Sequence, residues 1–328
     1  MSRRYVVVGG GAVGGALAAQ LVPAGHDVVL VARGEHGRAV AERGLVVRRP
    51  GRIDVVAAEV ASGPDEVALR PEDVLLLTVK TQDAEAALAA WAWQPVEGGG
   101  LAADLPVVTF QNGLLTEDLA LRRFARVYGA TIGIAASHLT PGEIVSPSEP
   151  PVVGLLWVGR YAAPADALQA ELVADFVGAG FAAWSVPDVR AQKAAKLLAN
   201  AANALDLLTG DDDLRARIRG ELRAETGAVL LAAGHLLPPG GELDRAGVEL
   251  RVLPVEGHVA GRLSTWQSFA RGASSEVDYL NGEVVLIARR HGVPAPVNTA
   301  LQRLLGPATG TTEAGQLEDL LAADHVLV

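Results

Sequence analysis

The chain contains no cysteine, so disulfide bonds, thiolate metal sites and a cysteine nucleophile are excluded. Histidine is also scarce: there are seven, and no two have the spacing of a zinc site, so we expect no bound metal. No run of 18 apolar residues occurs, and we therefore expect no membrane-spanning helix. A chain without thiols fits the reducing cytoplasm, which is the location we expect.

Positive charge is in deficit as well. The chain has 28 basic and 38 acidic residues, which gives a net charge of −10 and argues against general nucleic-acid binding. A basic cluster, Arg48, Arg49 and Arg52, flanks Pro50-Gly51, and we interpret it as a solvated hairpin. The length of 328 residues is enough for two domains with a sizeable core.

Glycine is abundant, and its most informative cluster lies near the start of the chain. Residues Tyr5 to Val8 are apolar and mostly β-branched, as in a buried strand. Gly9, Gly11 and Gly14 follow with the spacing G-x-G-x-x-G, and Ala12 to Leu21 is a small, apolar, helix-compatible segment. Such glycines allow a tight turn, a close approach to a pyrophosphate and close packing of helix on strand. We therefore predict dinucleotide binding, with the phosphates at the helix N-terminus.

A signal peptide is the competing interpretation of the same stretch, because Ser2-Arg3-Arg4 precedes an apolar run. Five glycines between Gly9 and Gly15 would make a poor apolar segment for export. The periodic pattern also continues into a second strand at residues 26–32. We therefore expect a folded nucleotide-binding unit at this position, not an export signal.

Strands alternate with helices through the first half of the chain, which is typical of a parallel sheet covered by helices. The expected strands are residues 28–32, 45–49, 53–57, 73–79, 106–110 and 181–186, and the expected helices are 12–21, 35–43, 84–91, 116–124 and 165–177. Between Arg126 and Trp157 we expect antiparallel β segments. From Pro187 the patterns are almost only helical, at residues 189–208, 213–233, 264–270, 276–291 and 318–323. The predicted domains are therefore 1–187 and 188–328.

The end of the second strand indicates which dinucleotide is bound. NAD-specific folds usually carry an acidic residue there to hold the ribose hydroxyls. Here the strand ends in Ala32 and Arg33 follows, although Glu35 lies close by. Because a guanidinium can donate charge-assisted hydrogen bonds to a 2′-phosphate, we favour NADP over NAD.

Two other strand ends carry polar side chains, and ligands of open α/β sheets bind at these ends. Lys80, Thr81 and Gln82 follow the apolar strand that begins at Asp73, so the Lys80 ammonium should emerge in the crevice. Asn112 follows the next strand, in Gln111-Asn112-Gly113. A turn would explain Asn112-Gly113 equally well in isolation, but the position at a strand end favours a ligand contact.

The helix expected after Pro187 carries lysine and asparagine among apolar neighbours. Asn200 and Asn203 lie four and seven residues after Lys196, which places all three on one helical face. A lysine near a carbonyl oxygen can donate a proton or stabilise a developing alkoxide, as a carbonyl reduction by hydride requires. Lys193 lies on the same helix, and we interpret it as a solvated surface residue.

These motifs, taken together, resemble those of the ketopantoate reductase (2-dehydropantoate 2-reductase) family. They occur in family order, from residue 5 to about residue 305, and the last two are the most specific. The motifs are Gly9 to Gly14 with Arg33, Val79-Lys80-Thr81, Gln111-Asn112-Gly113, Lys196-Leu-Leu-Ala-Asn200 and Glu276-Val-Asp-Tyr-Leu-Asn-Gly282. The resemblance implies an α/β fold with an N-terminal Rossmann-type dinucleotide-binding domain. It also implies an all-helical C-terminal domain like that of 6-phosphogluconate dehydrogenase, which serves substrate binding and dimerisation.

The resemblance further implies an NADPH-dependent reduction of 2-dehydropantoate to pantoate, in pantothenate biosynthesis. It makes Lys196 the catalytic acid and Glu276 a second catalytic residue, at the cofactor and the substrate. The implied substrate contacts are Asn112, Asn200, Asn203 and Ser264. The implied cofactor contacts are Gly9, Gly10, Gly11, Ala12, Val13, Gly14, Arg33, Lys80, Thr81, Gln82, Asn112 and Glu276.

The chain departs from the family pattern at two positions near the implied pocket. Many members carry a second asparagine eight residues after the lysine, where this chain has Ala204, and Trp266 adds bulk two residues after Ser264. Another keto acid therefore remains an alternative substrate. An imine is a further alternative, as in the β-hydroxyacid dehydrogenase and imine reductase group, but residues 187–193 lack the glycine usual there. A non-catalytic NADPH sensor is the third alternative, against which the lysine, the amides and Glu276 argue.

Overall fold

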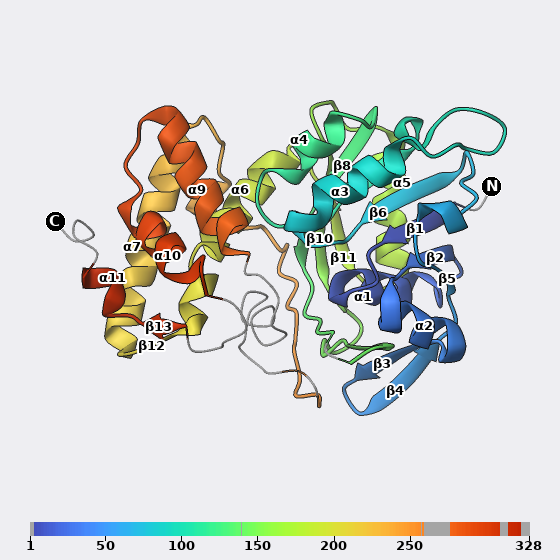
Figure 1. The fold of residues 1–328 in the computed structure, drawn as a ribbon, viewed down its shortest axis with the longest axis horizontal. Coiled ribbons are helices and arrows are strands. Elements are labelled where there is room, and N and C mark those ends of the chain that lie inside the picture. Colours follow the sequence, from blue (N-terminus) through green and yellow to red (C-terminus); the bar gives the residue numbers. More distant parts are fainter. Residues whose placement is uncertain (1–2, 139, 257, 259–275, 309–313, 323–328) are drawn as a thin grey trace. The chain divides into compact units, whose positions relative to one another are not determined.

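The computed structural model describes residues 3–138, 140–256, 258, 276–308 and 314–322. The chain divides into two compact units, whose elements are labelled in Figure 1. The first contains the chain up to Gln111, Thr116–Val189 and the segment that begins at Arg245. The second contains Asn112–Leu115, Arg190–Asp244 and the C-terminal elements. The domain boundary at residue 187 stays a prediction, since each unit takes segments from several parts of the chain.

An eight-stranded sheet forms the centre of the first unit, in the order β11-β10-β8-β7-β6-β1-β2-β5. Its strands are β1 (Arg4–Val8), β2 (Asp27–Val31), β5 (Glu59–Ala61), β6 (Asp73–Leu77), β7 (Pro106–Thr109), β8 (Arg126–Gly133), β10 (Leu155–Arg160) and β11 (Ala182–Ser185). β1 lies between β2 and β6, so the direction in which strands are added reverses at β1. Such a reversal opens a crevice for a ligand at the carboxyl ends of the strands.

The expected parallel sheet is confirmed, with one antiparallel pair. Among the described strand pairs of this sheet, β7 and β8 are parallel, and β8 and β10 are the antiparallel pair. The expectation of antiparallel pairing from residue 126 onward was therefore wrong for the β7 side of β8. The flanking helices are α1 (Ala12–Leu21), α2 (Gly34–Arg43), α3 (Thr81–Ala92), α4 (Thr116–Leu121) and α5 (Ala167–Gly178), with single 3₁₀ turns at Pro64–Glu66 and Ala102–Asp104.

A second, three-stranded sheet has the order β4-β3-β9. The predicted hairpin is confirmed as β3 (Leu45–Arg49) and β4 (Arg52–Val56), and β9 (Glu143–Val145) joins β3 in parallel. The interpretation of the basic cluster as solvated was wrong for Arg49, which is buried. Its Nε lies 2.7 Å from Oδ2 of Asp54. Arg49 also donates to the side chain of Gln20, so it connects the hairpin to α1.

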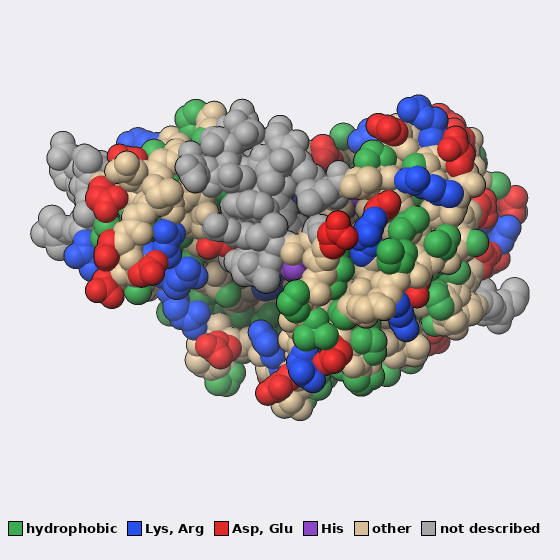
Figure 2. Space-filling view, turned by 90° about the horizontal axis from the view of Figure 1, so that it is seen from below, with side chains coloured by type: hydrophobic (Ala, Val, Ile, Leu, Met, Phe, Trp, Pro, Cys, Tyr) green, Lys and Arg blue, Asp and Glu red, His purple; other side chains and the backbone are tan. Residues whose placement is uncertain are grey.

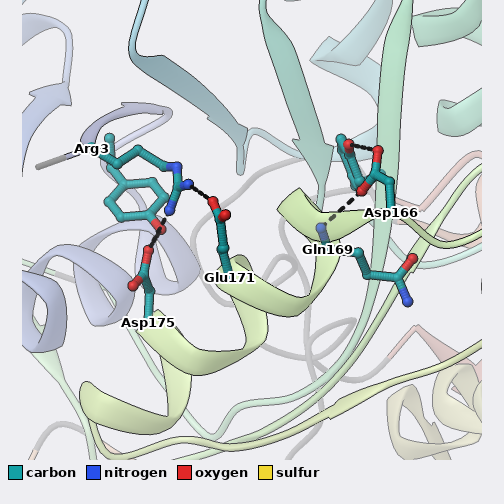
Figure 3. Close-up of polar contacts among 7 residues, drawn as sticks. Arg3, Asp166, Gln169, Glu171 and Asp175 are labelled. Carbon is teal, nitrogen blue, oxygen red and sulfur yellow. Dashed lines mark hydrogen bonds and ion pairs between the residues drawn. The ribbon is translucent and has the colours of Figure 1, made fainter. Parts of the chain in front are cut away.

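Acidic residues connect α5 to the sheet (Figure 3). Asp175 accepts hydrogen bonds from Arg3, at 2.8 Å, and from the Tyr5 hydroxyl on β1, and Glu171 pairs with Arg3 as well. At the start of the helix, Asp166 accepts from the Gln169 backbone N–H at 2.9 Å, which is an N-cap bond. Burial and the neighbouring carboxylate Asp175 raise the pKa of Tyr5 well above its ordinary value, so the phenol stays protonated and donates.

The second unit is mainly helical, as expected. Its described elements are α6 (Val189–Asn200), the 3₁₀ helix η3 (Asn203–Leu207), β12 (Leu208–Thr209), α7 (Asp212–Ala232), η4 (Pro239–Gly241), α9 (Val277–His291), α10 (Pro296–Leu305), β13 (Gly315–Gln316) and α11 (Asp319–Ala322). The helix α10 was not expected from the sequence, although Gly292 marks the end of α9 and Pro296 marks the first turn of α10. The helix expected at residues 264–270 lies outside the described residues.

Figure 2 shows one face of the molecule, on which acidic and basic side chains lie intermingled over the described parts. Within the described ranges, no helix is long and apolar enough to cross a membrane.

Candidate active site

The three glycines of the G-x-G-x-x-G motif have different surroundings in the turn between β1 and α1. Gly9 has a φ of 116°, which glycine adopts readily, and a Cβ there would lie 2.7 Å from the Val79 backbone N. A Cβ at Gly14 would lie 2.0 Å from the Gly9 carbonyl oxygen, so only glycine allows α1 to start this close to the turn. At Gly11 a Cβ would meet nothing within 4 Å. The fold does not require glycine at Gly11, which leaves its open space for a ligand.

Thr78, directly after the neighbouring strand β6, holds this turn, and the sequence alone did not predict this role. Its hydroxyl lies 2.7 Å from the Gly9 carbonyl oxygen and 3.1 Å from that of Val8. The Thr78 backbone N–H also donates to the Val8 oxygen, at 2.9 Å. Both β1 and the first glycine are therefore anchored to the end of β6 before any ligand binds.

The polar strand ends predicted from the sequence do meet at one edge of the sheet. The last residues of β1, β2, β6 and β7 are paired directly across the sheet: Val8 with Val31 and Leu77, and Leu77 with Thr109. The segments that follow these residues, including Arg33 and Lys80, therefore emerge at the same edge. This is the arrangement that the crevice of a dinucleotide-binding fold requires.

Gln111 is a second residue whose role was not predicted from the sequence. It is buried, and its side-chain amide donates to the carbonyl oxygens of Leu77, at 2.9 Å, and Val79, at 2.8 Å. The bonds hold the backbone that leads into Lys80, which is the N-cap residue of α3. Gln111 thus positions the predicted cofactor segment Lys80, Thr81 and Gln82, whose side chains are half-buried except for the buried Thr81.

The end of β2 carries the predicted determinant of cofactor choice. Arg33 is exposed and forms the N-cap position of α2, while Ala32 before it is buried. The unpaired N–H groups and partial positive charge at the start of α2 add to the guanidinium at this point. Both features favour an anion such as a phosphate.

His36, in the first turn of α2, packs against the glycine-rich turn. Its Nδ1 accepts a hydrogen bond of 2.9 Å from the Gly142 N–H, and its ring lies 4.2 Å from that of His138 between centroids. A Cβ on Gly10 would lie 3.5 Å from its Nε2, so the ring supports the glycine-rich turn. Burial lowers the pKa of His36 below its ordinary value, so the imidazole is neutral at pH 7.

In the second unit, α6 carries the predicted catalytic lysine. Lys196 is half-buried, and Asn200, one turn later, is buried and is the last residue of the helix. Asn203 is buried too, but it begins η3 after a break, so the expected seven-residue helical spacing from Lys196 was wrong. The interpretation of Lys193 as a solvated residue was also wrong, because only 3% of it is exposed.

Asn112 and Glu276 belong to the same unit as α6. Glu276 is buried and occupies the N-cap position of α9. The turn at Gly113, with a φ of 84°, lies so close to α9 that a Cβ there would be 2.8 Å from the Tyr279 carbonyl oxygen. Leu114 extends the contact, since it packs in the apolar cluster that includes Leu197 of α6 and Leu280 of α9.

The structure therefore assembles the predicted residues in two groups. The cofactor residues of the glycine-rich turn, Arg33 and the Lys80 segment lie in the first unit. The described substrate and catalytic residues lie in the second unit: Asn112, Lys196, Asn200, Asn203 and Glu276. Ser264 lies outside the described residues. Among the described side chains, no group of three or more potential metal ligands occurs.

Comparison with known proteins agrees with this organisation. The family profile "Ketopantoate reductase PanE/ApbA" matches residues 5–154, and its companion "Ketopantoate reductase PanE/ApbA C terminal" matches residues 188–308. The chain belongs to the ketopantoate reductase family. It is thus an NADP-dependent oxidoreductase, and the resemblance inferred from its motifs is confirmed.

Individual relatives cover almost the whole chain. The 2-dehydropantoate 2-reductase of Pyrococcus horikoshii is 26% identical over 310 residues, which span 92% of this chain and 96% of the relative. The crystal structure of a PanE/ApbA family ketopantoate reductase from Ralstonia eutropha JMP134 is 27% identical, with a TM-score of 0.74 over 92% of this chain and 97% of its own. A D-mandelate dehydrogenase, solved with NADH and anilino(oxo)acetate, is 17% identical with a TM-score of 0.73 over 98% of each chain, and shares the fold.

The cofactor of this family fits the first unit. The open space at Gly11 admits a pyrophosphate against the backbone, and the N-terminus of α1 offers it N–H donors. No carboxylate stands at Ala32, and the exposed Arg33 follows it. A guanidinium can pair with the 2′-phosphate that distinguishes NADPH from NADH, so the prediction of an NADP contact at Arg33 fits this position.

Proposed function

We propose that the protein reduces a 2-keto acid to the 2-hydroxy acid, with 2-dehydropantoate as substrate and pantoate as product. The observation that carries the proposal is the position of Lys196 and Asn200 one turn apart on α6, in the unit that also holds Asn112 and Glu276. A cation next to amide donors suits a substrate with a ketone oxygen and a carboxylate.

The residues of the second unit have distinct roles in this reaction. Asn112, Asn200, Asn203 and Ser264 hold the keto acid. Bound NADPH supplies the hydride that reduces the ketone carbon. Lys196, as an ammonium, stabilises the negative charge that develops on the ketone oxygen and gives it a proton from Nζ. The neutral amine then takes a proton from solvent, which restores the acid. Glu276 orients the cofactor and the substrate.

The residues of the first unit bind NADPH. The turn from Gly9 to Gly14, including Gly10, Ala12 and Val13, would hold the pyrophosphate, and Arg33 would bind the 2′-phosphate. Lys80, Thr81 and Gln82 contact the cofactor at the end of β6, together with Asn112 and Glu276. We assign the NADP-binding domain to residues 1–187 and the helical substrate domain to residues 188–328. The compact units differ from these ranges, because Asn112–Leu115 belongs to the second unit and the segment that begins at Arg245 belongs to the first.

The biological setting follows from the same proposal. We place the enzyme in pantothenate biosynthesis and in the cytoplasm, where the absence of cysteine fits a reducing environment. We also propose a homodimer that associates through the helical unit. Sedimentation equilibrium tests the dimer directly, and a monomer at micromolar concentration would exclude it.

The decisive experiment measures the oxidation of NADPH with a panel of 2-keto acids that includes 2-dehydropantoate and bulky aryl keto acids. The proposal predicts the highest kcat/KM with 2-dehydropantoate, and a much lower value with NADH in place of NADPH. Preference for another keto acid or for an imine would support the alternative substrates. Binding of NADPH without turnover of any compound would support a sensor.

A further inference from the structure

The motif Glu276-Val-Asp-Tyr-Leu-Asn-Gly282 carries an asparagine, Asn281, that the proposed reaction does not use. It lies on α9, and only 1% of it is exposed. Its side-chain Nδ2 donates two hydrogen bonds: one to the Ala201 carbonyl oxygen at 2.8 Å and one to Asn298 Oδ1 at 2.9 Å. Both hydrogens of the amide are therefore used, and one of them reaches the residue directly after Asn200.

The bond to Ala201 lies at the point where α6 ends. The Ala201 N–H still donates to Leu197 in helical fashion, at 2.9 Å, but the regular helix stops at Asn200 and η3 begins at Asn203. The last carbonyl groups of a helix have no partner within it. Asn281 provides that partner from another helix, between the two asparagines proposed to hold the substrate.

A chain of acceptors fixes the orientation of the Asn281 amide. The Glu225 carboxylate of α7 accepts from Asn298 Nδ2, at 2.8 Å, and from the backbone N–H groups of Val297 and Asn298. Because the carboxylate can only accept, Asn298 must direct its nitrogen to Glu225 and its oxygen to Asn281. Asn281 must then direct its own nitrogen to Asn298 and Ala201, since the flipped amide would oppose oxygen to oxygen at both contacts.

Two neighbours of Asn281 in the motif brace the same helix against α10. Asp278 accepts a hydrogen bond of 2.8 Å from the Gln302 amide. A Cβ on Gly282 would lie 2.7 Å from that same amide nitrogen, so glycine lets Gln302 pass close to α9. Glu276 begins this braced helix, which places the proposed catalytic glutamate and the support for Asn200 and Asn203 on one rigid element.

We propose that Asn281 is a positioning residue for the reduction: through the Ala201 carbonyl it sets the end of α6 and the start of η3, and so the places of Asn200 and Asn203. This inference rests on the proposed function. A displacement of about 1 Å in a substrate-holding group can lower a rate by about 100-fold. Loss of the bond should therefore reduce catalysis more than the accompanying loss of stability explains.

The first test replaces Asn281 by leucine, which has nearly the same shape and no donors. We expect kcat/KM for the keto acid to fall about 10- to 100-fold at 25 °C, while the Kd of NADPH stays within about twofold. Ile287→Ala is the matched control, because Ile287 is buried on the same helix and lies six residues further on. It should lower the Tm without this loss of kcat/KM. Equal kinetic losses in the two variants at similar Tm would overturn the proposal.

Two further variants separate positioning from a general effect on packing. Thr226→Val removes a 3.3 Å contact to Asn298 but leaves the bond to Ala201, so it should keep near-normal kcat/KM. Asn281→Asp keeps the shape, and burial opposite two oxygen acceptors should raise the pKa of the new carboxyl group. Its protonated form can donate one bond, so kcat/KM relative to the unaltered protein should rise as the pH falls. A ratio independent of pH contradicts the proposal.

Amide hydrogen exchange tests the inference separately from activity. The Leu205 N–H donates to the Ala202 carbonyl at the start of η3. Asn281→Leu should accelerate exchange there relative to Ile287→Ala, even if the protein reduces none of the keto acids offered. Unequal exchange without activity would refute the proposed substrate but keep the structural role. Equal exchange in the two variants would refute the role of Asn281 itself.

Discussion

Gly11 and Gly14 lie three residues apart in one turn, yet an added methyl group would meet different surroundings at each. At Gly14 the new Cβ would lie 2.0 Å from the Gly9 carbonyl oxygen and 2.6 Å from the Thr78 hydroxyl. At Gly11 it would meet nothing within 4 Å, and the backbone there, with φ of −70° and ψ of −161°, is open to alanine. We therefore predict that Gly14→Ala damages the fold, whereas Gly11→Ala damages only cofactor binding.

The expected loss of stability at Gly14 follows from the contact distance. Cβ atoms in proteins keep about 3.0 Å or more from such an oxygen, so α1 and the turn must separate by about 1 Å. Overpacking a close-packed region costs about 1–3 kcal/mol, and we expect about 3 kcal/mol because the obstacle is backbone. At about 2–4 °C per kcal/mol for a domain of this size, the Tm should fall by about 6–12 °C.

The expected effect at Gly11 concerns the ligand instead. A methyl group there would hold the pyrophosphate away from the N–H groups at the start of α1. One lost hydrogen bond to a charged group costs about 1.5–3 kcal/mol, which corresponds to about a 10- to 150-fold weaker Kd for NADPH. The free energy of unfolding without cofactor should stay within about 0.5 kcal/mol of the unaltered protein.

The assay combines thermal unfolding without NADPH and calorimetric titration with NADPH. Gly178→Ala serves as the control, because Gly178 ends α5 and a Cβ there also meets nothing within 4 Å. This control variant should change the Tm by no more than a few degrees and should leave the Kd of NADPH unchanged. If Gly11→Ala binds NADPH like the unaltered protein, or if Gly14→Ala unfolds at the same temperature, the assignment of this turn is wrong.

Three further predictions concern single side chains. Arg33→Ala should weaken NADPH binding by about 1.5–3 kcal/mol and leave NADH binding unchanged, since only NADPH carries the 2′-phosphate; equal losses in titrations of both would contradict the role of Arg33. Lys196→Ala should lower kcat by a factor of about 10²–10⁴ with little change in Tm. Lys193 is buried, so Lys193→Ala should mainly lower the Tm. If kinetics and thermal unfolding instead show the larger loss of kcat for Lys193→Ala, the assignment of Lys196 as the acid is wrong. Burial lowers the pKa of His36 in the folded state. The neutral imidazole therefore makes its whole contribution to the free energy of unfolding above the unfolded-state pKa of about 6.5, and this contribution is lost as the pH falls through the folded-state pKa. Denaturant titrations between pH 7 and pH 5 should therefore show a smaller decline for His36→Asn, which keeps an acceptor for Gly142, and an unchanged decline would refute this.

Local sequence was sufficient where neighbouring residues decide the structure. The strand, turn and helix from Arg4 to Leu21 follow from one apolar run, the φ of Gly9 and the small residues after Gly11. The hairpin around Pro50-Gly51 follows in the same way, from a turn between two β-branched segments. The ends of parallel strands meet at one edge for topological reasons, so the sequence also indicated which polar residues would gather there.

Contacts between distant segments decided the rest. The apolar pattern continues to Leu208 without glycine or proline, yet α6 stops at Asn200. Directly after it, the Ala201 carbonyl oxygen accepts a hydrogen bond from Asn281, 80 residues further along the chain. No local pattern reveals that bond, because a hydrogen bond across helices depends on their packing. The burial of Lys193 and Arg49 and the bonds from Thr78 and Gln111 to neighbouring strands likewise arise only when the segments come together. Periodicity shows which residues can share a face, but the partner that satisfies a buried polar group is set by the tertiary structure.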